Sequence, residues 1–385
     1  MRSRLVLRDF RVLPAPYCRP QEESHRWLAA AHAHAGAKAA GRRAATEQSL
    51  DRMERRVRYF GCSSEHIGFR RSELEDFTHT DWHRMRIFNL NGHSESRALR
   101  DRNDFFSRVA ERRVTDFFDG DCDPPSDLLH VTCTGYASPS AAQRLIELKG
   151  WHGRTRATHA YHMGCYAAIP ALRIAAGLSS FPQDGVPPRV EIVHTELCTL
   201  HFNPGDHSPE QLIIQSLFAD GHARYTLVPD GEPGGRRGFE LLAVREETVP
   251  DSLGDMTWVV SDQGFRMTLS RDVPGKIAAV LAGFLGRIVQ ASGAGPDAAG
   301  PSAVFAVHPG GPRIIDSIQE LLRLEDRQVA HSRAVLFEFG NLSSATLPHI
   351  WARVCDDPGV ASGTPIISIA FGPGLTVAGA VFRKC

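Results

Sequence analysis

The chain alternates between long segments with helical periodicity and short segments that are continuously apolar. Residues 19–60 are rich in Ala and Arg and contain few β-branched residues, which favours helix. Residues 94–118 place apolar side chains at helical spacing and predict an amphipathic helix. Residues 140–148 predict a shorter helix.

Short apolar runs that stop at polar or Gly-containing turns predict buried strands. They are residues 127–133, 190–194, 303–307, 334–339 and 366–371. Because these strands alternate with helices, we expect a layered α/β fold whose sheets are buried on both faces. Two stretches rich in Gly and Pro, residues 229–238 and 291–302, predict surface connections. The same strand-to-turn pattern precedes and follows the first stretch, which indicates an internal duplication.

Composition narrows the class of protein. The 44 Lys and Arg residues balance 44 Asp and Glu residues, so a broad basic surface for nucleic acid is not expected. The sequence contains no run of about 18 apolar residues, so we expect no membrane span. A signal peptide is not expected, and the eight Cys form no C-x-x-C pair, which favours a reducing cytoplasm. His159 and His162 lack a third local ligand, so we expect no metal site.

Cys165 is the candidate nucleophile. It opens an apolar helical stretch, residues 165–177, in which Pro170 is tolerated only near the helix start. Cys165 is therefore expected at a helix N-terminus, where unpaired amides and the positive end of the helix dipole stabilise a thiolate. A lone Cys is more often a buried structural residue, so its partners decide the interpretation.

His308 and Asn341 are the candidate partners of Cys165. His308 follows the apolar run of residues 303–307 and precedes Pro-Gly-Gly-Pro, and Asn341 follows Gly340 at the end of another apolar run. Side chains at such Gly-rich turns project into cavities and are often functional. Cys, His and Asn in this order suggest a thiolate nucleophile with two polar partners.

Several motifs together resemble the chalcone-synthase-like, or type III, polyketide synthases, and in particular their bacterial members. They are Gly164-Cys165-Tyr166-Ala167, His308-Pro309-Gly310-Gly311-Pro312, Gly340-Asn341-Leu342-Ser343-Ser344 and Gly372-Pro373-Gly374. The resemblance implies a thiolase-like αβαβα five-layer sandwich of two pseudo-duplicated halves, working as a homodimer. Residues 1–235 would form the half that carries the Cys, and residues 236–385 the half that carries the His and the Asn.

The resemblance also implies a mechanism. Cys165 would attack an acyl thioester and carry the chain as an enzyme thioester. His308 would pair with the thiolate and, with Asn341, donate hydrogen bonds to the carbonyl of a malonyl-type extender, which stabilises the enolate left by loss of CO₂. Acyl-CoA and malonyl-CoA would be substrates, and no cofactor is expected. We expect a pyrone or resorcinol-type product.

The resemblance further implies which residues line the substrate-binding cavity. They are Cys133, Cys198, His201, Phe218, Trp258, Met267, Ser343 and Gly374. Phe218 matches the family's gate aromatic, whereas Met267 stands where a second aromatic is usual and would admit a bulkier acyl chain. Trp258 would reduce the volume, and Cys198 is more typical of bacterial members. His201 is interpreted as a cavity wall in preference to a second acid or base.

Arg55, Arg56 and Arg58 are the candidates for binding the acyl donor. Plant members of the family anchor the phosphates of CoA with Lys and Arg before the segment that is residues 66–71 here, yet residues 59–64 carry no charge. The three arginines could substitute, receive an acyl carrier protein or form a solvated helix face. The choice between CoA and carrier protein is therefore open.

Three other functions compete with this interpretation. A papain-type hydrolase shares the Cys-His-Asn order, but Gly164-Cys165 lacks the preceding Cys of that family's motif. A ketosynthase that joins two preformed acyl chains on carrier proteins would use the same residues. A non-catalytic partner subunit is disfavoured, because Cys165, His308 and Asn341 are all intact.

Overall fold

The computed structural model describes residues 4–88, 98–120, 122–182, 188–231 and 237–385. The predicted boundary between the two halves, at residues 235 and 236, lies outside the described residues. So do residues 94–97, the first part of one predicted helix.

Nine strands form one mixed sheet in the order β11-β12-β13-β8-β1-β7-β6-β4-β5. Their bounds are β1 (Leu5–Pro14), β4 (Asp127–Thr132), β5 (Arg156–Tyr161), β6 (Val190–Leu197), β7 (Asp220–Pro229), β8 (Gly238–Thr248), β11 (Val304–Val307), β12 (Pro365–Gly372) and β13 (Thr376–Lys384). β1 pairs antiparallel with both β7 and β8, and it thereby joins the strands of the two halves edge to edge. Strands β4 and β6 are buried at every position, which is typical of parallel strands covered on both faces.

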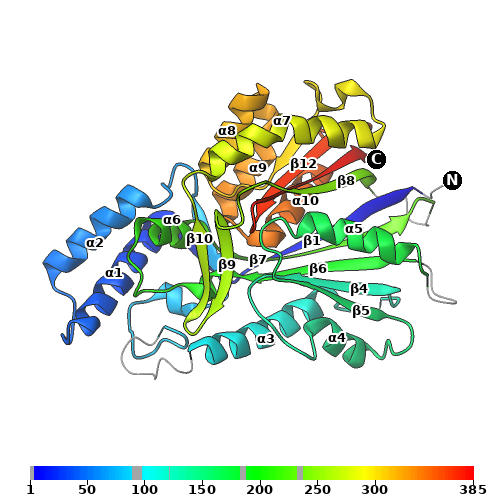
Figure 1. The fold of residues 1–385 in the computed structure, drawn as a ribbon. Helices are drawn as coiled ribbons and strands as arrows, with labels where there is room; N and C mark the ends of the chain where they lie inside the picture. Colours follow the sequence, from blue (N-terminus) through cyan, green and yellow to red (C-terminus); the bar gives the residue numbers. More distant parts are fainter. Residues whose placement is uncertain (1–3, 89–97, 121, 183–187, 232–236) are drawn as a thin grey trace.

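Helices cover both faces of this sheet (Figure 1). Two helices also lie between its two parts, which are the strands from β11 to β8 and the strands from β7 to β5. The bounds are α1 (Gln21–Ala39), α2 (Glu47–Phe60), α3 (Ala98–Phe117), α4 (Ala141–Lys149), α5 (Ala168–Ser179), α6 (Pro209–Leu217), α7 (Val273–Ser292), α8 (Pro312–Leu322), α9 (Asp326–Phe339) and α10 (Thr346–Asp356). α7 and α9 pack on β8, β11 and β13, and α3 and α4 pack on β6 and β4. α5 and α10 lie between and share one core with strands of both parts. This layer order confirms the expected αβαβα architecture.

Smaller elements flank the main sheet. They are β2 (Tyr17–Pro20), which pairs with β3 (Phe69–Ser72), the hairpin of β9 (Met256–Ser261) and β10 (Gly264–Leu269), and the 3₁₀ turns η1 (Glu75–Thr78), η3 (Cys198–His201), η4 (Pro296–Ala299) and η5 (Ser343–Ala345). α1 and α2 extend to one side of the molecule and pack against α6 (Figure 1).

The apolar run at residues 334–339 was predicted as a strand, and this prediction is wrong: the run is the last part of α9. The helix begins upstream, at a capping box between Glu325 and Gln328. Val329 and Leu336 are buried on one helix face, whereas Phe337 is 41% exposed. A short apolar run cannot by itself distinguish a strand from a helix, so the preceding cap and the one-sided burial decide the element.

α7 is the one helix in the described part of the chain with the length and composition to cross a membrane. Its buried residues, among them Ile277, Leu281 and Phe284, belong to a core cluster, and the helix packs against β8 and β13. The core helix of a globular fold has the same composition, so the helix is weak support for a membrane span.

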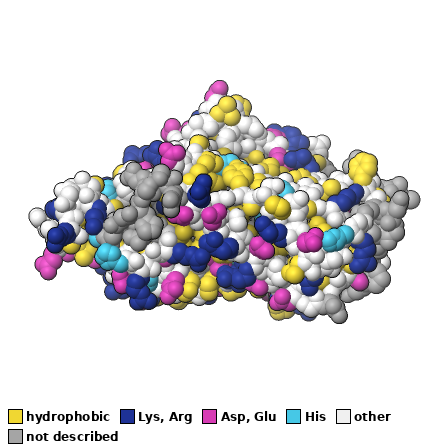
Figure 2. All heavy atoms as spheres, turned by 90° about the horizontal axis from the view of Figure 1, so that it is seen from below, with side chains coloured by type: hydrophobic (Ala, Val, Ile, Leu, Met, Phe, Trp, Pro, Cys, Tyr) yellow, Lys and Arg dark blue, Asp and Glu magenta, His cyan; other side chains and the backbone are white. Residues whose placement is uncertain are grey.

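Charged side chains of both signs cover the face shown in Figure 2. Basic side chains gather near its middle and acidic ones lie among and around them. This mixture agrees with the equal numbers of acidic and basic residues in the chain, 44 of each.

The buried histidines should make the fold acid-sensitive. Burial lowers the pKa of seven of them, to about 4 for His25, His32 and His349 and to about 3 for His130, His194, His201 and His308. Between pH 6.5 and 4 the unfolded chain therefore binds more protons than the folded protein. The free energy of unfolding should fall as pH falls through this window, by roughly 1.4 kcal/mol per pH unit for each ring.

Urea unfolding at successive pH values checks this expectation. Burial raises the pKa of two carboxyl groups, Asp220 to about 7 and Glu196, which opposes the trend but involves fewer groups than the seven histidines. His349→Phe should lower the slope of the unfolding free energy against pH by about one proton, because it removes one buried ring that bonds to the Ala345 carbonyl and packs on Phe339. A free energy of unfolding that stays constant from pH 7 to pH 4.5 would contradict the prediction.

Candidate active site

Cys165 lies in the turn between β5 and α5 and is 8% exposed. The Ala167 amide donates to the Gly164 carbonyl at 3.1 Å and closes the turn. Gly164 has a φ of +78°, and a Cβ atom there would lie 2.5 Å from the Pro373 ring. The Gly-Pro-Gly turn after β12 thus packs directly on the turn that carries the thiol. Cys165 stands before the first turn of α5, as the sequence predicted.

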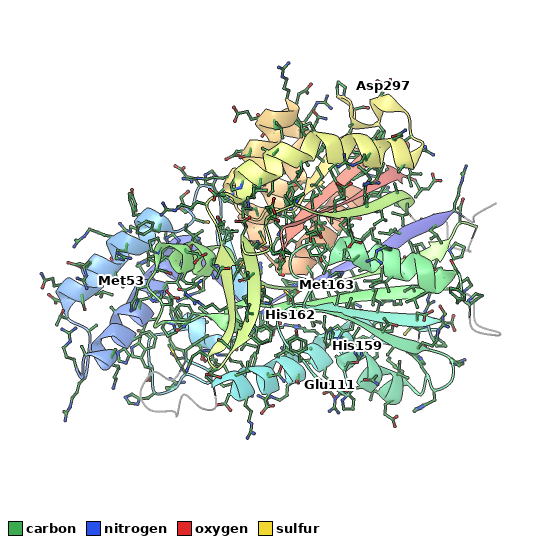
Figure 3. All side chains as sticks on the ribbon, in the orientation of Figure 1. Met53, Glu111, His159, His162, Met163 and Asp297 are labelled. Atoms are coloured by element: carbon green, nitrogen blue, oxygen red, sulfur yellow. The ribbon has the colours of Figure 1, made fainter. Side chains whose placement is uncertain are left out.

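The residues just before Cys165 lead from the end of β5 towards the β9–β10 hairpin. His162 and Met163 lie beside the β9–β10 hairpin (Figure 3), and His162 Nε2 is 2.8 Å from the Trp258 carbonyl oxygen. His159 lies further back along β5, next to Tyr161. Within the described residues, no group of three His, Cys, Asp or Glu side chains is arranged to hold a metal ion.

Ser343 connects Cys165 to a second thiol. Its hydroxyl interacts with the Cys165 side chain and lies 2.9 Å from Cys133 Sγ. Ser343 has a φ of +50°, a left-handed conformation that is uncommon outside Gly and is often found at functional sites. The Cys133 thiol in turn donates to Glu196 Oε2 at 3.4 Å. A continuous polar path therefore runs from Cys165 to a buried carboxylate.

Glu196 is a site residue that the sequence analysis did not single out. It is the last residue but one of β6 and is fully buried. Its oxygens accept from the Cys133 amide at 3.1 Å and from Thr134 Oγ1 at 3.0 Å, and Ser344 Oγ also donates to it. The signal was present, because Thr195-Glu196 is the polar end of a predicted strand, where functional side chains gather.

His308 and Asn341 are buried, and each has side-chain nitrogen without a partner in the described structure. For His308 neither ring nitrogen has a hydrogen-bond partner among the described residues, and its backbone amide donates to the Ile369 carbonyl at 2.8 Å. For Asn341, Oδ1 accepts from the Ser343 amide at 2.8 Å while Nδ2 has no acceptor. Buried groups of this kind are rare unless a ligand or water completes them.

Burial controls the charge of the site. It raises the pKa of the Cys165 thiol to about 12, although the Ser343 and Asn341 side chains act in the opposite direction. It lowers the pKa of His308 to about 3. Burial therefore acts against the thiolate that the sequence predicts at Cys165 and favours a neutral thiol beside a neutral imidazole. The Ser343 and Asn341 side chains act in the direction of the thiolate.

The strand order brings His308 towards the turn of Cys165. β11 runs parallel to β12, with Val307 opposite Ile369, and β12 leads into the turn at Pro373. Because Pro373 packs on Gly164, the carboxyl ends of β11 and β12 lie at the Cys165 end of the layer.

A cavity of about 60 Å³ opens beside Cys165. Its wall contains seven of the residues predicted from the sequence: Cys133, Cys198, His201, Phe218, Trp258, Met267 and Ser343. Gly374, which was also predicted to line the cavity, is not a wall residue. Its amide donates to the Met256 carbonyl at 3.0 Å. Pro373 of the same turn does line the cavity. His308 and Asn341 are buried but are not wall residues.

The wall also holds residues that sequence reasoning missed. They are Arg70, Phe77, Thr134, Thr199, Phe202, Gln211, Ile214, Gln215, Met256 and Phe265. Phe265 lies two positions before Met267 on β10, so period-two alternation could have placed both on one face. Gln211, Ile214 and Gln215 lie at helical spacing on one face of α6. The remaining residues come from segments far apart in the sequence.

His201 and Trp258 form a rigid side of the cavity. His201 Nδ1 accepts from the Phe265 amide at 3.0 Å, and Nε2 lies 2.9 Å from the Thr134 carbonyl oxygen. The His201 ring also stacks on Phe265 with centroids 4.3 Å apart. Trp258 Nε1 donates to the Cys133 carbonyl at 2.6 Å. Both nitrogens of His201 are occupied by backbone, which favours its interpretation as a wall.

Arg70 holds the backbone of Phe218 in place. Its Nε and Nη2 atoms donate to the Phe218 carbonyl at 3.0 and 2.6 Å. Leu217 and Ala219, on either side, bond to the backbone of Asn341 at 3.0 and 2.9 Å. Burial lowers the pKa of Arg70 to about 10, so the guanidinium is charged at neutral pH. Phe218, the expected gate residue, and Asn341 are therefore held by one connected set of hydrogen bonds.

Arg55, Arg56 and Arg58 lie on α2 and outside the cavity wall. Arg55 and Arg58 are exposed, while Arg56 donates to the His207 carbonyl at 2.9 Å and covers the Phe60 ring. α2 packs against α6, whose other side contributes Gln211, Ile214 and Gln215 to the cavity.

Comparisons with known proteins agree with this arrangement. Residues 240–385 match the profile of the chalcone and stilbene synthases, C-terminal domain, and residues 121–230 match the profile of the N-terminal domain of the same synthases. The chain belongs to the chalcone and stilbene synthase family. This confirms the resemblance to type III polyketide synthases that the motifs indicated.

Two curated relatives share about two thirds of the chain. A 1,3,6,8-tetrahydroxynaphthalene synthase from Streptomyces griseus is 32% identical over 256 residues, which cover 66% of this chain and 65% of the relative. Type III polyketide synthase C from Arabidopsis thaliana is 28% identical over 261 residues, which cover 67% of each chain. Since one relative is bacterial and the other is from a plant, membership of the bacterial type stays a prediction.

Solved structures resemble the fold along its whole length. The C-terminal type III polyketide synthase domain of Steely1, a type I/III hybrid from Dictyostelium, has a TM-score of 0.81 at 20% identity and covers 99% of both chains. PKS-I from the brown alga Ectocarpus siliculosus has a TM-score of 0.80 at 23% identity, covering 100% of this chain and 99% of its own. These likenesses confirm the thiolase-like fold class.

Gly164→Ala tests the contact that positions Cys165. The added methyl group would collide with Pro373 and would also hold a strained φ, so we expect a loss of about 2–4 kcal/mol in the free energy of unfolding, measured by urea. Gly177→Ala is the matched control in α5, because nothing lies within 4 Å of its added Cβ. The control should gain about 0.5–1 kcal/mol. Equal stability of the two variants would show that the turns do not interlock.

Proposed function

We propose that this protein is a type III polyketide synthase that extends an acyl starter by decarboxylative Claisen condensation. One observation carries the proposal: a buried thiol at an apolar cavity occurs together with a buried imidazole and a buried carboxamide whose nitrogens have no hydrogen-bond partner in the described part of the chain. In a folded protein, polar groups left in this state favour a ligand that completes them. A thioester carbonyl is such a ligand.

Loading begins when the Cys165 sulfur attacks the acyl carbonyl of the starter thioester. The S–H proton passes to His308, the new C–S bond forms, and the donor's own sulfur leaves and takes up the proton. Because both Cys165 and His308 are neutral in the buried site, proton transfer accompanies attack and does not precede it.

Extension uses a malonyl-type thioester. Its carboxylate leaves as CO₂, and the electron pair of the broken C–C bond forms an enolate. Asn341 Nδ2 and the His308 ring donate to the enolate oxygen, as in an oxyanion hole. The enolate carbon then attacks the Cys165 thioester, and the Cys165 sulfur is released. An apolar cavity protects the enolate from protons of water.

The substrates proposed are acyl-CoA or acyl-carrier-protein thioesters with malonyl-CoA as extender, and the chemistry requires no cofactor or metal. Arg55 and Arg58 on α2 offer exposed positive charge for the anionic donor. We further propose a cytoplasmic homodimer that forms a pyrone or resorcinol-type product. The cavity of about 60 Å³ supports a short chain in preference to a long one.

Cys165→Ala should abolish acyl loading, because no other group is proposed to form the thioester. Intact-protein mass spectrometry after incubation with acyl-CoA starters measures the adduct. Cys198→Ala is the matched control, since Cys198 lines the same cavity and should leave loading in place. Full condensation by the Cys165→Ala variant would refute the proposal.

His308→Ala and Asn341→Ala should lose decarboxylation more severely than loading. Removal of one donor to an oxyanion typically costs on the order of 10²–10³ in rate. Release of CO₂ from malonyl-CoA and formation of the acyl adduct, measured on the same samples, separate the two steps. Acyl transfer without any release of CO₂ by the wild-type protein would favour the chain-joining ketosynthase.

Met267→Phe should narrow the range of starters. Met267 lies opposite Trp258 across the β9–β10 hairpin, and a rigid ring there would reduce the space for an acyl chain. We expect kcat/KM for a long acyl-CoA to fall about tenfold relative to a short one. Val259→Phe, on an exposed position of the same hairpin, should leave this ratio unchanged. A ratio that is equal in all three proteins would contradict the role of Met267.

A further inference from the structure

A groove of about 840 Å³ lies at the opposite end of the parallel strands from Cys165. Its wall residues Arg154 and Arg189 precede β5 and β6, whereas Cys165 follows β5. The groove shares no wall residue with the cavity at Cys165, and no step of the proposed mechanism uses it. Five of its wall residues are arginines, namely Arg8, Arg11, Arg154, Arg189 and Arg224.

Two of these arginines lie directly opposite each other on neighbouring strands. Arg11 of β1 and Arg224 of β7 are paired in register, which places their side chains on the same face of the sheet. Both guanidinium groups donate to the carbonyl of Phe117 at the end of α3, at 3.2 and 2.6 Å. Two positive charges therefore converge on one uncharged oxygen. Like charges in this position destabilise a sheet, so an anion between them would be stabilising.

The backbone of β1 is irregular at the same place. Its pairing with β7 shifts register between Arg8 and Arg11, and Asp9 between them has a φ of +57°. Such bulges redirect side chains, and left-handed residues other than Gly cost free energy, so both features are enriched at functional sites. Here they turn Arg8, Asp9 and Arg11 towards the groove, since all three are wall residues.

Three of the arginines are held in place by carboxylates. Arg224 Nε donates to Glu191 Oε2 at 2.8 Å, and Arg189 Nε lies 3.5 Å from Glu191 Oε1. Arg8 Nε lies 3.4 Å from Asp9 Oδ2. These ion pairs orient the guanidinium groups before any ligand arrives, which lowers the entropy cost of binding.

The charge of the groove is not balanced. Arg11 and Arg154 are exposed, and neither forms an ion pair in the part of the chain that the structure describes. The wall holds five guanidinium groups and three carboxylates, of which the third is the exposed Asp123. Two positive charges are therefore in excess. Phosphate matches this surplus, because it is largely a dianion at neutral pH and its oxygens fit the fork of a guanidinium group.

We propose that this groove is a binding site for a phosphate group, either free in solution or carried by a small molecule. Arg11 and Arg224 are its main donors, because Nη2 of each makes no hydrogen bond within the described residues. Arg154 adds positive charge. The inference does not rest on the proposed function, since the groove and the cavity at Cys165 are built from different residues.

Isothermal titration calorimetry with inorganic phosphate tests the proposal, at an ionic strength fixed with sodium chloride so that binding must exceed general screening. Arg11→Ala should raise the Kd for phosphate about tenfold or more, because it removes a charged donor. This variant should fold, since Arg11 is exposed and Arg224 still donates to the Phe117 carbonyl. Arg154→Ala should weaken binding in the same direction. Arg11→Lys keeps the charge but loses the fork, so its Kd should lie between those of the wild type and Arg11→Ala.

Two other arginines separate this site from the rest of the surface. Arg100→Ala is the matched control and should leave the Kd unchanged, because Arg100 is exposed at the first turn of α3 while the groove lies at the last. Arg58→Ala removes charge from the proposed donor site on α2 and should also leave it unchanged. Loss of phosphate binding in Arg58→Ala, with normal binding in Arg11→Ala, would place the anion on α2 and overturn the proposal.

Adenosine monophosphate, titrated into Arg58→Ala, distinguishes the two sources of the phosphate group. Tighter binding than that of inorganic phosphate would identify a phosphate ester as the ligand, and equal affinity would identify the free ion. Adenosine itself should not bind. Absence of phosphate binding by the wild-type protein, or the same Kd for the wild type and Arg11→Ala, would overturn the proposal. The titrations need no acyl donor, so a failure of the proposed synthase activity would leave them interpretable.

Discussion

Two turns from opposite halves of the chain interlock at the site, and its geometry depends on this contact. Gly164 has no room for a methyl group because the Pro373 ring occupies the space, and Gly372 has none because the Tyr166 ring lies 2.1 Å from where a Cβ would be. Each turn therefore fixes the other. Cys165 lies between Gly164 and Tyr166, so the sulfur is held by residues more than 200 positions away in the sequence.

The same packing excludes water, and this decides the electrostatics of the site. Burial raises the pKa of every thiol around the cavity and lowers that of every buried imidazole beside it. A charge-separated resting state would be expensive in such surroundings. The site presents oriented polar groups instead: the hydroxyl of Ser343, and the Asn341 Nδ2 atom and the His308 ring, whose nitrogens have no hydrogen-bond partner among the described residues. Such groups stabilise a charge that develops during a reaction without carrying one beforehand.

The cavity wall shows how one scaffold can be adapted to different acyl chains. Its aromatic side comes from the β9–β10 hairpin, where Trp258 and Phe265 are fixed through His201. Its polar side comes from the residues that follow β4 and β6, where Cys133, Thr134 and Thr199 lie. The hairpin forms its own two-stranded sheet and is not part of the nine-stranded one. Substitutions there can change the volume of the cavity with little effect on the layers that hold Cys165.

Much of this arrangement could be predicted from the amino-acid sequence. Neighbouring residues alone indicate the buried strands at residues 127–133 and 366–371 and the helix after Cys165. They also indicate the motifs at His308 and Asn341. Local patterns failed at residues 334–339, because a six-residue apolar run fits a strand and a helix equally well. The pKa shifts of Cys165 and His308 and the contacts of Glu196 and Arg70 depend on residues brought together from several strands. The burial of a side chain and the direction of its hydrogen bonds are set only when the layers pack together. No single segment of the sequence therefore determines them.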